Sequence, residues 1–333
     1  MRYLVTGSAG FIGSHLCNKL ASNGHEIVAV DNLSSYYDIN LKKARIKEFL
    51  SASNIESVNI DVSKSTEVDN LVWESKPDVV IHLAAQAGVR LPVQESDKYV
   101  TSNLVGFSNV LRSTVVNKVP YFLYASSSSV YGDLASIPYV ETEQNLHPNS
   151  FYGATKLANE LLTPTIVQNS STAARGLRFF TVYGPWGRPD MAYFRMIANV
   201  ISGVDFNFFG DGSVERDFTF IDDAVNSVVL LTEQLQKQKP GFSDVVNLGG
   251  GRPLSMNYLL ETVGKLSSKE VVYTRQSGNQ NDAKKTMSDS TYIQSLIGSK
   301  PSTKLEDGIA KTIEWAKRAD ISPNLNSWVN SVK

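Results

Sequence analysis

Tyr152 and Lys156 stand four residues apart, a spacing that places two side chains on the same face of a helix. A phenol takes a proton from a hydroxyl group near neutral pH only if its pKa lies well below the ordinary value of about 10. A neighbouring ammonium group favours the phenolate and so lowers that pKa. Ser150 is a suitable N-cap, which would place the pair in the first turns of its helix. The pattern therefore predicts that Tyr152 is a catalytic base assisted by Lys156.

A run of serines, 126–129, directly follows the strand predicted at residues 121–125. Open α/β sheets place their reacting groups at the carboxyl ends of strands. A hydroxyl group there can share a proton with Tyr152 and with the hydroxyl group of a substrate. Ser127, Ser128 and Ser129 are therefore further candidate catalytic residues.

Gly7, Gly10 and Gly13 follow the first predicted strand and open the first predicted helix. In dinucleotide-binding turns, glycines allow a tight turn, the close approach of a pyrophosphate, and the packing of the helix on the strand. The helix N-terminus supplies free N–H groups and a positive dipole end. The spacing GxxGxxG is a variant of the usual GxGxxG. We expect the contacts of this turn to come from Gly7, Gly10, Phe11, Ile12 and Gly13.

Asp31 ends the second predicted strand, 18 residues after Gly13. An acid at this position accepts hydrogen bonds from the ribose hydroxyl groups and repels a 2′-phosphate, so the sequence predicts NAD rather than NADP. The positive nicotinamide ring would also lower the pKa of Tyr152. Asp61, just past the third predicted strand, is expected to meet the adenine edge. The other candidate cofactor contacts are Asn32, Val62, Leu83, Ala84 and Ala85.

Short β-branched runs alternate with amphipathic stretches through the first half of the chain. The predicted strands are 2–6, 26–31, 57–60, 79–83, 121–125 and 175–180, and the predicted helices lie near 11–22, 40–50, 64–75, 98–117 and 151–168. Strands this apolar, separated by helices, indicate a parallel sheet that is covered on both faces. The expected fold is α/β: a doubly wound (Rossmann) sheet with a smaller mixed α/β lobe. We assign residues 1–183 to the dinucleotide-binding domain, which a later segment could rejoin, and residues 184–333 to the substrate lobe.

The composition restricts the class of protein. Of 333 residues, 42% are hydrophobic and 20% charged, the balance of an ordinary globular chain. A formal net charge of −1 gives no basis for general nucleic-acid binding, and no apolar run approaches the roughly 20 residues that span a bilayer. The 4 histidines lack metal-ligand spacing, and the single cysteine, Cys17, cannot form an internal disulfide. We expect a cytoplasmic protein with no metal, nucleic-acid or membrane partner.

With these motifs, residues 82–90, 125–132, 177–191 and 216–223 resemble the extended short-chain dehydrogenase/reductases, and among them the nucleotide-sugar epimerases that act on UDP-glucuronate. The resemblance covers nearly the whole chain. It implies an NAD that stays bound while UDP-glucuronate and UDP-galacturonate interconvert through a 4-keto sugar, with Tyr152 taking the C4-hydroxyl proton. It also implies a homodimer formed through the helices near 98–117 and 151–168.

The resemblance also assigns roles to individual residues. Ser127 matches the usual catalytic serine, Phe180 matches a residue that packs beside the nicotinamide, and Thr181 matches a contact to the sugar. Tyr152 and Lys156 would contact the cofactor as well.

Three arginines are candidates for binding the acidic parts of the substrate, since arginine can bind a carboxylate or phosphate with two parallel bonds. Arg188 matches a contact near the sugar carboxylate and Arg216 a diphosphate contact, and Arg90 is a further candidate. Trp186 is expected to line the substrate opening. The stretch 279–282 departs from the family pattern, so the contacts expected from that loop are in doubt.

Other chemistries in related families use different residues at 128 and 129. Related dehydratases carry an Asp-Glu pair there and related decarboxylases a Glu, whereas this chain has Ser128 and Ser129. Without a carboxyl group there, deprotonation at C5 and loss of water from C6 have no obvious agent. The alternatives that stay open are a 4-epimerase of neutral or N-acetylated UDP-hexoses, a UDP-glucuronate decarboxylase, and an NAD-holding regulatory protein without turnover.

Overall fold

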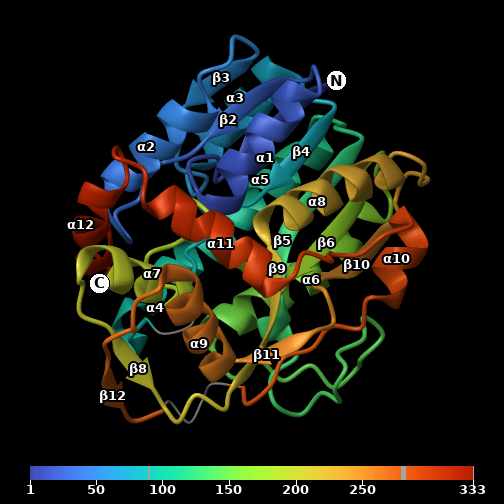
Figure 1. The fold of residues 1–333 in the computed structure, drawn as a ribbon. Coiled ribbons are helices and arrows are strands. Elements are labelled where there is room, and N and C mark those ends of the chain that lie inside the picture. The colour runs from blue at the N-terminus through green and yellow to red at the C-terminus, as the bar shows by residue number, and fades with distance from the viewer. Residues whose placement is uncertain (89–90, 279–282, 333) are drawn as a thin grey trace.

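A parallel sheet with the strand order β10-β6-β5-β4-β1-β2-β3 forms the centre of the computed structural model, which describes residues 1–88, 91–278 and 283–332 (Figure 1). Its strands are β1 (Arg2–Thr6), β2 (Glu26–Val30), β3 (Ile55–Val58), β4 (Val79–His82), β5 (Tyr121–Ser127), β6 (Ala173–Phe179) and β10 (Ser243–Leu248). A second sheet has the order β11-β9-β7, and β12 pairs with β8. These strands are β7 (Thr181–Tyr183), β8 (Asn207–Phe209), β9 (Glu215–Phe220), β11 (Pro253–Ser255) and β12 (Thr274–Gln276).

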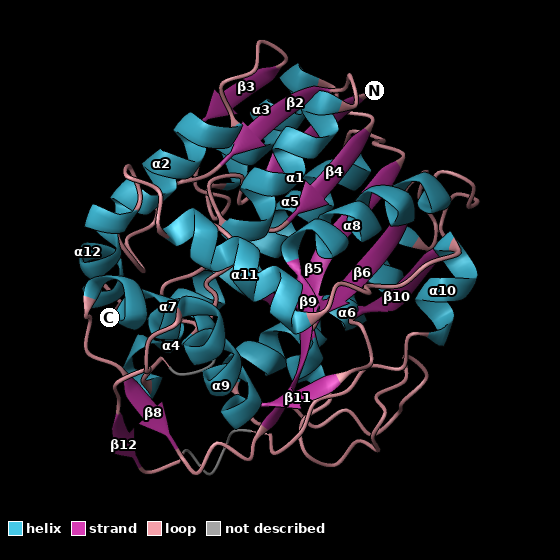
Figure 2. Ribbon diagram, viewed as in Figure 1, coloured by secondary structure: helices cyan, strands magenta, loops and turns pink. Residues whose placement is uncertain are grey.

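Helices cover both faces of the large sheet, as Figure 2 shows. The described helices are α1 (Phe11–Ser22), α2 (Ile39–Phe49), α3 (Ser65–Ser75), α4 (Ser96–Tyr99), α5 (Phe107–Val116), α6 (Phe151–Val167), α7 (Ala192–Ser202), α8 (Ile221–Leu235), α9 (Met256–Ser267), α10 (Thr291–Ile297), α11 (Leu305–Ala316) and α12 (Leu325–Asn330). The core on one face includes residues of α1, α2 and α8, and the core on the other includes residues of α3, α5 and α6.

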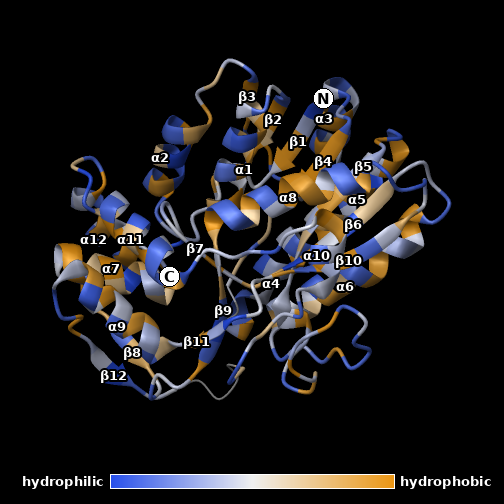
Figure 3. Ribbon diagram, turned by 45° about the vertical axis from the view of Figure 1, so that its right-hand side comes forward, coloured by the Kyte–Doolittle hydropathy of each residue, from blue (hydrophilic) through white to orange (hydrophobic). Residues whose placement is uncertain are grey.

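Successive apolar side chains along a strand point to opposite faces of the sheet, which explains why helices cover both faces. In β1, Tyr3 and Val5 lie in one core and Leu4 in the other. In β4, Ile81 lies in the first of these cores and Val80 in the second. Because successive side chains of a strand point to opposite faces, apolar residues at every position require a layer of helices on each side. Strands β1, β2, β4 and β5 are accordingly mostly apolar, while the helices carry both polar and apolar faces (Figure 3). The predicted doubly wound fold is confirmed.

The strand ends and the helix near residues 98–117 differ from the prediction. The third strand is 55–58 rather than 57–60, and the sixth is 173–179 rather than 175–180. The predicted single helix comprises α4, a π-helical stretch, η2 (Val100–Gly106), and α5. Hydrophobic periodicity cannot distinguish a π-helical turn from an α-helical one, and π-helical segments occur frequently at functional sites.

The chain leaves the large sheet at the carboxyl end of β6. Phe180 separates β6 from β7, which belongs to the smaller sheet. The chain returns through α8, which packs against α1, and through β10, which pairs with β6 at the edge of the large sheet. β8 and β12 lie at the end of the molecule remote from that sheet (Figure 1). The smaller lobe is therefore joined to the large sheet where the serine run and the Tyr–Lys helix begin.

Candidate active site

The glycine turn joins β1 to α1 so closely that no side chain fits at Gly7 or Gly13. Gly7 has a φ of +73°, and a Cβ there would lie 2.7 Å from the backbone nitrogen of Ala84. A Cβ on Gly13 would lie 2.1 Å from the carbonyl oxygen of Gly7. The turn is closed by the Gly10 N–H, which donates to the Gly7 carbonyl at 3.0 Å. Since the first N–H groups of a helix lack intrahelical acceptors, this bare turn fits a pyrophosphate.

Asp31 is tied both to this turn and to a lysine. Its carboxylate accepts from the backbone N–H of Ala9 at 3.1 Å and of Leu33 at 2.8 Å. It also forms an ion pair with Lys42, whose Nζ lies 3.2 Å away, and both side chains are nearly buried. No local signal indicated Lys42, which lies 11 positions further on, in α2. Because Lys42 neutralises Asp31, repulsion of a 2′-phosphate is weaker than a lone carboxylate would give.

The predicted adenine-end residues lie together. The side-chain amide of Asn32 donates to Asp61 at 3.0 Å, and the Ser63 N–H donates to the other carboxylate oxygen at 2.9 Å. Although burial acts to raise the pKa of Asp61, these hydrogen bonds hold it below its ordinary value. Val62 is buried next to them.

Leu83 and Ala84 continue the edge of the sheet past β4. Their N–H groups donate to the backbone oxygen and to the hydroxyl group of Thr6, at 3.1 and 3.2 Å. Ala85 is partly buried in the same loop. His82, at the end of β4, is buried and bonds the Thr6 hydroxyl at 2.8 Å. Burial and the charge of Lys156 lower its pKa to about 3, so His82 is a neutral packed residue.

Tyr152 and Lys156 occupy the first turns of α6, as predicted. Ser150 caps the helix by accepting from the Gly153 N–H at 3.0 Å. The Lys156 ammonium lies 5.7 Å from the centre of the Tyr152 ring and donates to the carbonyl of Ala125, in β5, at 2.8 Å. The pair is thereby fixed against the strand that carries the serines.

The pKa of Tyr152 does not follow the prediction. Burial raises it, while the charge of Arg188 and a hydrogen bond with the Ser127 side chain only partly oppose the rise. The expected lowering by Lys156 is therefore wrong for the protein alone. Lys156 is itself affected: burial lowers its pKa to about 8, although the charge of Glu160 acts in the opposite direction.

The serine run places hydroxyl groups at the carboxyl end of β5. Ser127 Oγ accepts from the Ser129 N–H at 3.1 Å and donates to the Ser129 hydroxyl at the same distance. Ser128 begins a short 3₁₀ turn, η3 (Ser128–Val130), and is partly buried. With its hydrogen bond to Tyr152, Ser127 is the serine that the structure brings to the phenol.

Phe180 and Thr181 lie next to the serines because Ser127 pairs with Phe179 across β5 and β6. Phe180 is buried, and its N–H donates to Leu248 at the end of β10. Thr181 begins β7 and is partly buried. Both predicted residues therefore lie at the junction of the two lobes.

Arg188 is close enough to Tyr152 to influence its pKa, but one edge of its guanidinium is occupied. Nε donates to Asp190 at 3.0 Å, and Nη2 donates to the second oxygen of the same carboxylate. The hydroxyl group of Tyr36 also reaches Asp190, at 3.4 Å. A Cβ on Gly88 would lie 2.5 Å from this hydroxyl group and 3.9 Å from Arg188 Nη2. The Nε–Nη2 edge is thus not available for the two parallel bonds expected with a substrate.

Of the remaining predicted contacts, Arg216 lies on β9, Trp186 is buried in the core, and the others lie outside the described residues. Arg216, on β9, donates to the carbonyls of Glu215 and Ala283 at 2.9 and 2.7 Å. Arg90 and residues 279–282 lie outside the described residues. Trp186 is only 4% exposed, so the expectation that it lines an opening is wrong: its ring packs 5.4 Å from Trp315.

A buried ionic network behind Lys156 was not predicted. Glu160 binds Arg178 through both carboxylate oxygens, at 2.7 and 2.9 Å, and accepts from the Ser126 hydroxyl. Arg178 also donates to Tyr131, at 2.8 Å. The available signal was the spacing of Glu160, which follows Lys156 by one helical turn. The network connects α6 to the strand and loop that carry the serines.

Within residues 1–88, 91–278 and 283–332, no helix is both long and apolar enough to cross a membrane. Over the same residues, no group of three or more His, Cys, Asp and Glu side chains could hold a metal ion.

The comparisons with known proteins agree with this geometry. The model of the NAD dependent epimerase/dehydratase family matches residues 3–249. The chain belongs to this family. A probable UDP-glucuronate 4-epimerase from Rhizobium meliloti (strain 1021) is 36% identical over 331 residues, which cover 95% of this chain and 96% of the relative. UDP-glucuronate 4-epimerase 5 from Arabidopsis thaliana is 37% identical over 94% of this chain and 74% of its own length.

A solved structure of a UDP-glucuronic acid 4-epimerase has a fold closely similar to that of this chain. The crystal structure of UDP-glucuronic acid 4-epimerase from Bacillus cereus, in complex with UDP-glucuronic acid and NAD, has a TM-score of 0.87 and 33% identity, covering 95% of this chain and 99% of that one. The resemblance that the motifs indicated and the expected dependence on NAD are confirmed.

Proposed function

We propose that this epimerase interconverts UDP-glucuronate and UDP-galacturonate by oxidation and reduction at C4 of the sugar. The observation that carries the proposal is the meeting of Tyr152, Lys156 and Ser127 at the carboxyl edge of the sheet that also holds the glycine turn. The names of the relatives from R. meliloti and A. thaliana, and of the B. cereus structure, support the choice of sugar.

The turn at Gly7–Gly13 would hold the pyrophosphate of NAD, and Asp31 would accept bonds from its adenosine ribose. When bound, NAD supplies an acceptor for the C4 hydride and a donor for its return. Tyr152 takes the proton of the C4 hydroxyl group and later gives it back. Since burial raises the pKa of Tyr152, the phenolate depends on nearby positive charge, which Arg188 and the cationic form of the cofactor provide.

Ser127 is placed to share a proton between the phenol and the substrate hydroxyl group. Ser128 and Ser129 offer neutral hydroxyl groups where related enzymes of other chemistry have acids. A 4-keto uronate is a β-keto acid that loses CO₂ readily, so its carboxylate must be held away from the geometry that permits this. Hydroxyl groups can hold it by hydrogen bonds without supplying an acid for elimination.

A second candidate, a 4-epimerase of neutral UDP-hexoses, is favoured by one observation. Asp190 binds Arg188 through two oxygens, so the pair carries little net charge to attract a uronate. Replacing Arg188 by alanine separates the two candidates. It should reduce turnover of UDP-glucuronate far more than that of UDP-galactose if the uronate is the substrate.

We also propose that the enzyme is a homodimer. Helices α5 and α6 pack against each other, and large apolar side chains stay exposed on them and on η2. These side chains are Val105, Val116, Phe151, Leu161 and Leu162. Their exposure indicates a surface that a second copy would cover.

Separate incubations with UDP-glucuronate, UDP-glucose and UDP-N-acetylglucosamine, with products identified by NMR, test the function. Tyr152→Phe should reduce inversion of UDP-glucuronate by at least about 100-fold, the scale of positioned acid–base catalysis. Tyr121→Phe is the matched control, because its hydroxyl group contacts Gln236 at the other end of β5. A Tyr152→Phe protein with the parent rate, or an NAD-loaded parent that inverts none of the sugars, would contradict the proposal.

A further inference from the structure

Arg45, on α2, is fully buried and bridges two segments of the active site. Its Nε donates to the carbonyl of Trp186 at 2.9 Å, and its Nη2 donates to the carbonyl of Gly187 at 2.8 Å. Its Nη1 donates to the carbonyl of Ala9 at 3.2 Å and to the hydroxyl group of Tyr37 at 2.6 Å. All four acceptors are neutral oxygen atoms. A buried cation requires such bonds, so this arrangement holds the four groups together firmly.

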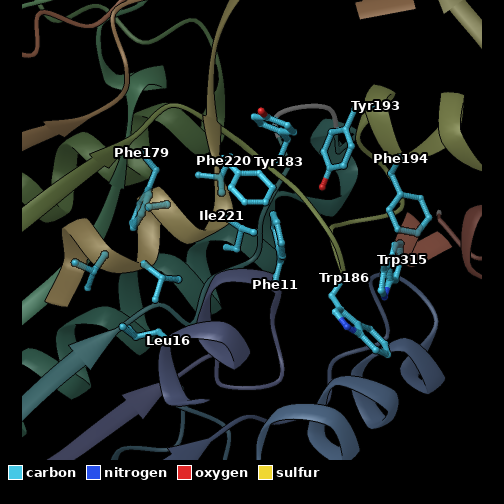
Figure 4. Packing of buried hydrophobic residues seen from close by; sticks show 14 of the residues in the cluster. Phe11, Leu16, Phe179, Tyr183, Trp186, Tyr193, Phe194, Phe220, Ile221 and Trp315 are labelled. Carbon is cyan, nitrogen blue, oxygen red and sulfur yellow. The ribbon is translucent and has the colours of Figure 1, made fainter. Parts of the chain in front are cut away.

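Two of these acceptors belong to a strained turn just before Arg188. Trp186 has a φ of +62°, a conformation that bulky residues rarely adopt and that persists only where the surroundings impose it. Its ring is held against Trp315, as Figure 4 shows, while Arg45 holds its carbonyl. The backbone at Gly187 is equally confined, because a Cβ there would lie 1.7 Å from the hydroxyl oxygen of Tyr193. This turn sets the direction in which the side chain of Arg188 leaves the chain.

The third acceptor, Ala9, belongs to the glycine turn. Its carbonyl accepts from Arg45, and its N–H donates to Asp31 at 3.1 Å. The same peptide segment is therefore bonded on one side to the acid assigned to the ribose of NAD. On the other side it is bonded, through Arg45, to the turn that precedes Arg188.

We propose that Arg45 is a positioning residue that fixes Arg188 relative to the cofactor-binding turn and so sets recognition of the sugar carboxylate. This rests on the proposed function, in which the substrate is a uronate and the loss of Arg188 impairs its turnover. Arg45 acts through the Trp186–Gly187 turn and contacts neither substrate nor cofactor. A guanidinium has the planar fork that reaches two successive carbonyls and a third on another loop, whereas an ammonium group is a point charge without this geometry.

A double-mutant cycle on NAD-loaded protein tests the proposal, with Arg45→Met, Arg188→Ala and the double variant. Calorimetry measures the affinity of each for UDP-glucuronate and for UDP. Arg45→Met should weaken UDP-glucuronate binding by about 10-fold and leave UDP binding within about 2-fold. In the Arg188→Ala background, Arg45→Met should have little further effect, because the two residues act as a unit.

The matched control is Arg175→Met. Arg175 is also fully buried, but it pairs with Asp244 on the edge strand β10 and donates to the carbonyl of Leu231 in α8. Its loss should lower thermal stability without changing the ratio of the two affinities. If Arg45→Met does not fold, Tyr37→Phe removes one acceptor and should change the same ratio by about 2-fold; an unchanged ratio would then overturn the proposal.

The outcomes separate the positioning role from the proposed function. Equal weakening of UDP and UDP-glucuronate by Arg45→Met, or the same loss in the Arg188→Ala background, overturns the positioning role alone. A parent protein that binds UDP-glucuronate no more tightly than UDP overturns carboxylate recognition, and the positioning role with it.

Discussion

Lys156 carries a charge that folding places in an unfavourable environment. Burial lowers its pKa from 10.5 to about 8, even though the charge of Glu160 opposes the change. A difference of roughly two and a half pH units corresponds to about 3 kcal/mol in the free energy of unfolding. Because the folded state binds this proton less tightly than the unfolded state, the cost is complete below about pH 8. It disappears as the pH rises towards 10.5.

Lys156→Met should therefore abolish epimerisation and yet stabilise the protein near neutral pH. The substitution removes the buried charge but also the hydrogen bond to Ala125, worth about 1 kcal/mol. The net expected gain is about 2 kcal/mol at pH 7. For a cooperative unit of roughly 150–250 residues, this raises the melting temperature by about 4–8 °C. Near pH 10.5 the gain should be absent or reversed, since only the loss of the hydrogen bond remains.

Thermal unfolding of the parent and of Lys156→Met, followed by circular dichroism at pH 7 and pH 10, measures this difference in stability. Both proteins must be free of NAD, because a dinucleotide that binds only the folded state stabilises it by mass action. The control is Lys269→Met, whose ammonium donates to the carbonyl of Val200 at 2.9 Å but belongs to an exposed residue. It should change stability by less than about 0.5 kcal/mol at either pH. A Lys156→Met protein less stable than the parent at pH 7, or equally stabilised at both pH values, would refute the reasoning.

Three further predictions concern the cofactor and the assembly. Gly13→Ala should abolish retention of NAD, because the new Cβ would lie 2.1 Å from a carbonyl oxygen. The ratio of the absorbances at 260 and 280 nm measures this retention. The control, Gly264→Ala, should retain the cofactor, since the nearest atom to its new Cβ lies 3.4 Å away. Asp31→Ser should reduce the preference for NAD over NADP by about 10-fold in a fluorescence titration, and an unchanged preference would exclude the assigned role. Leu161→Glu, at a side chain 65% exposed on α6, should give monomers in analytical ultracentrifugation, whereas Leu134→Glu, at 66% exposed outside α5 and α6, should not.

The fold and the cofactor turn were predictable because their signals are local. Apolar runs of strand length, separated by amphipathic stretches, require a sheet covered on both sides. The glycines at 7, 10 and 13 mark one turn, and in the structure a backbone contact excludes a Cβ at each of Gly7 and Gly13. Tyr152 and Lys156 were predictable for the same reason, since one helical turn fixes their relation.

The electrostatics of the same residues were not predictable, because they depend on burial and on distant partners. The pair spacing gives a cation near a phenol and so suggests a lowered pKa for Tyr152. The structure shows that burial outweighs nearby charge and raises it. Likewise, the sequence gives no indication that Asp31 is neutralised by Lys42, or that Glu160 pairs with Arg178 behind the helix.

The neighbours of a motif residue also affect which substrate the residue recognises. An arginine at position 188 indicates a group that can bind a carboxylate, but its attraction for a uronate depends on how firmly Asp190 holds the Nε–Nη2 edge. Its direction depends on a turn whose strained φ at Trp186 is fixed by Arg45, 141 positions earlier in the chain. Two relatives could thus share the arginine and differ in substrate because the residues that orient it differ. Discrimination between uronate and neutral sugars should therefore follow Arg45, Asp190 and the Trp186 turn together, rather than the identity of residue 188 alone.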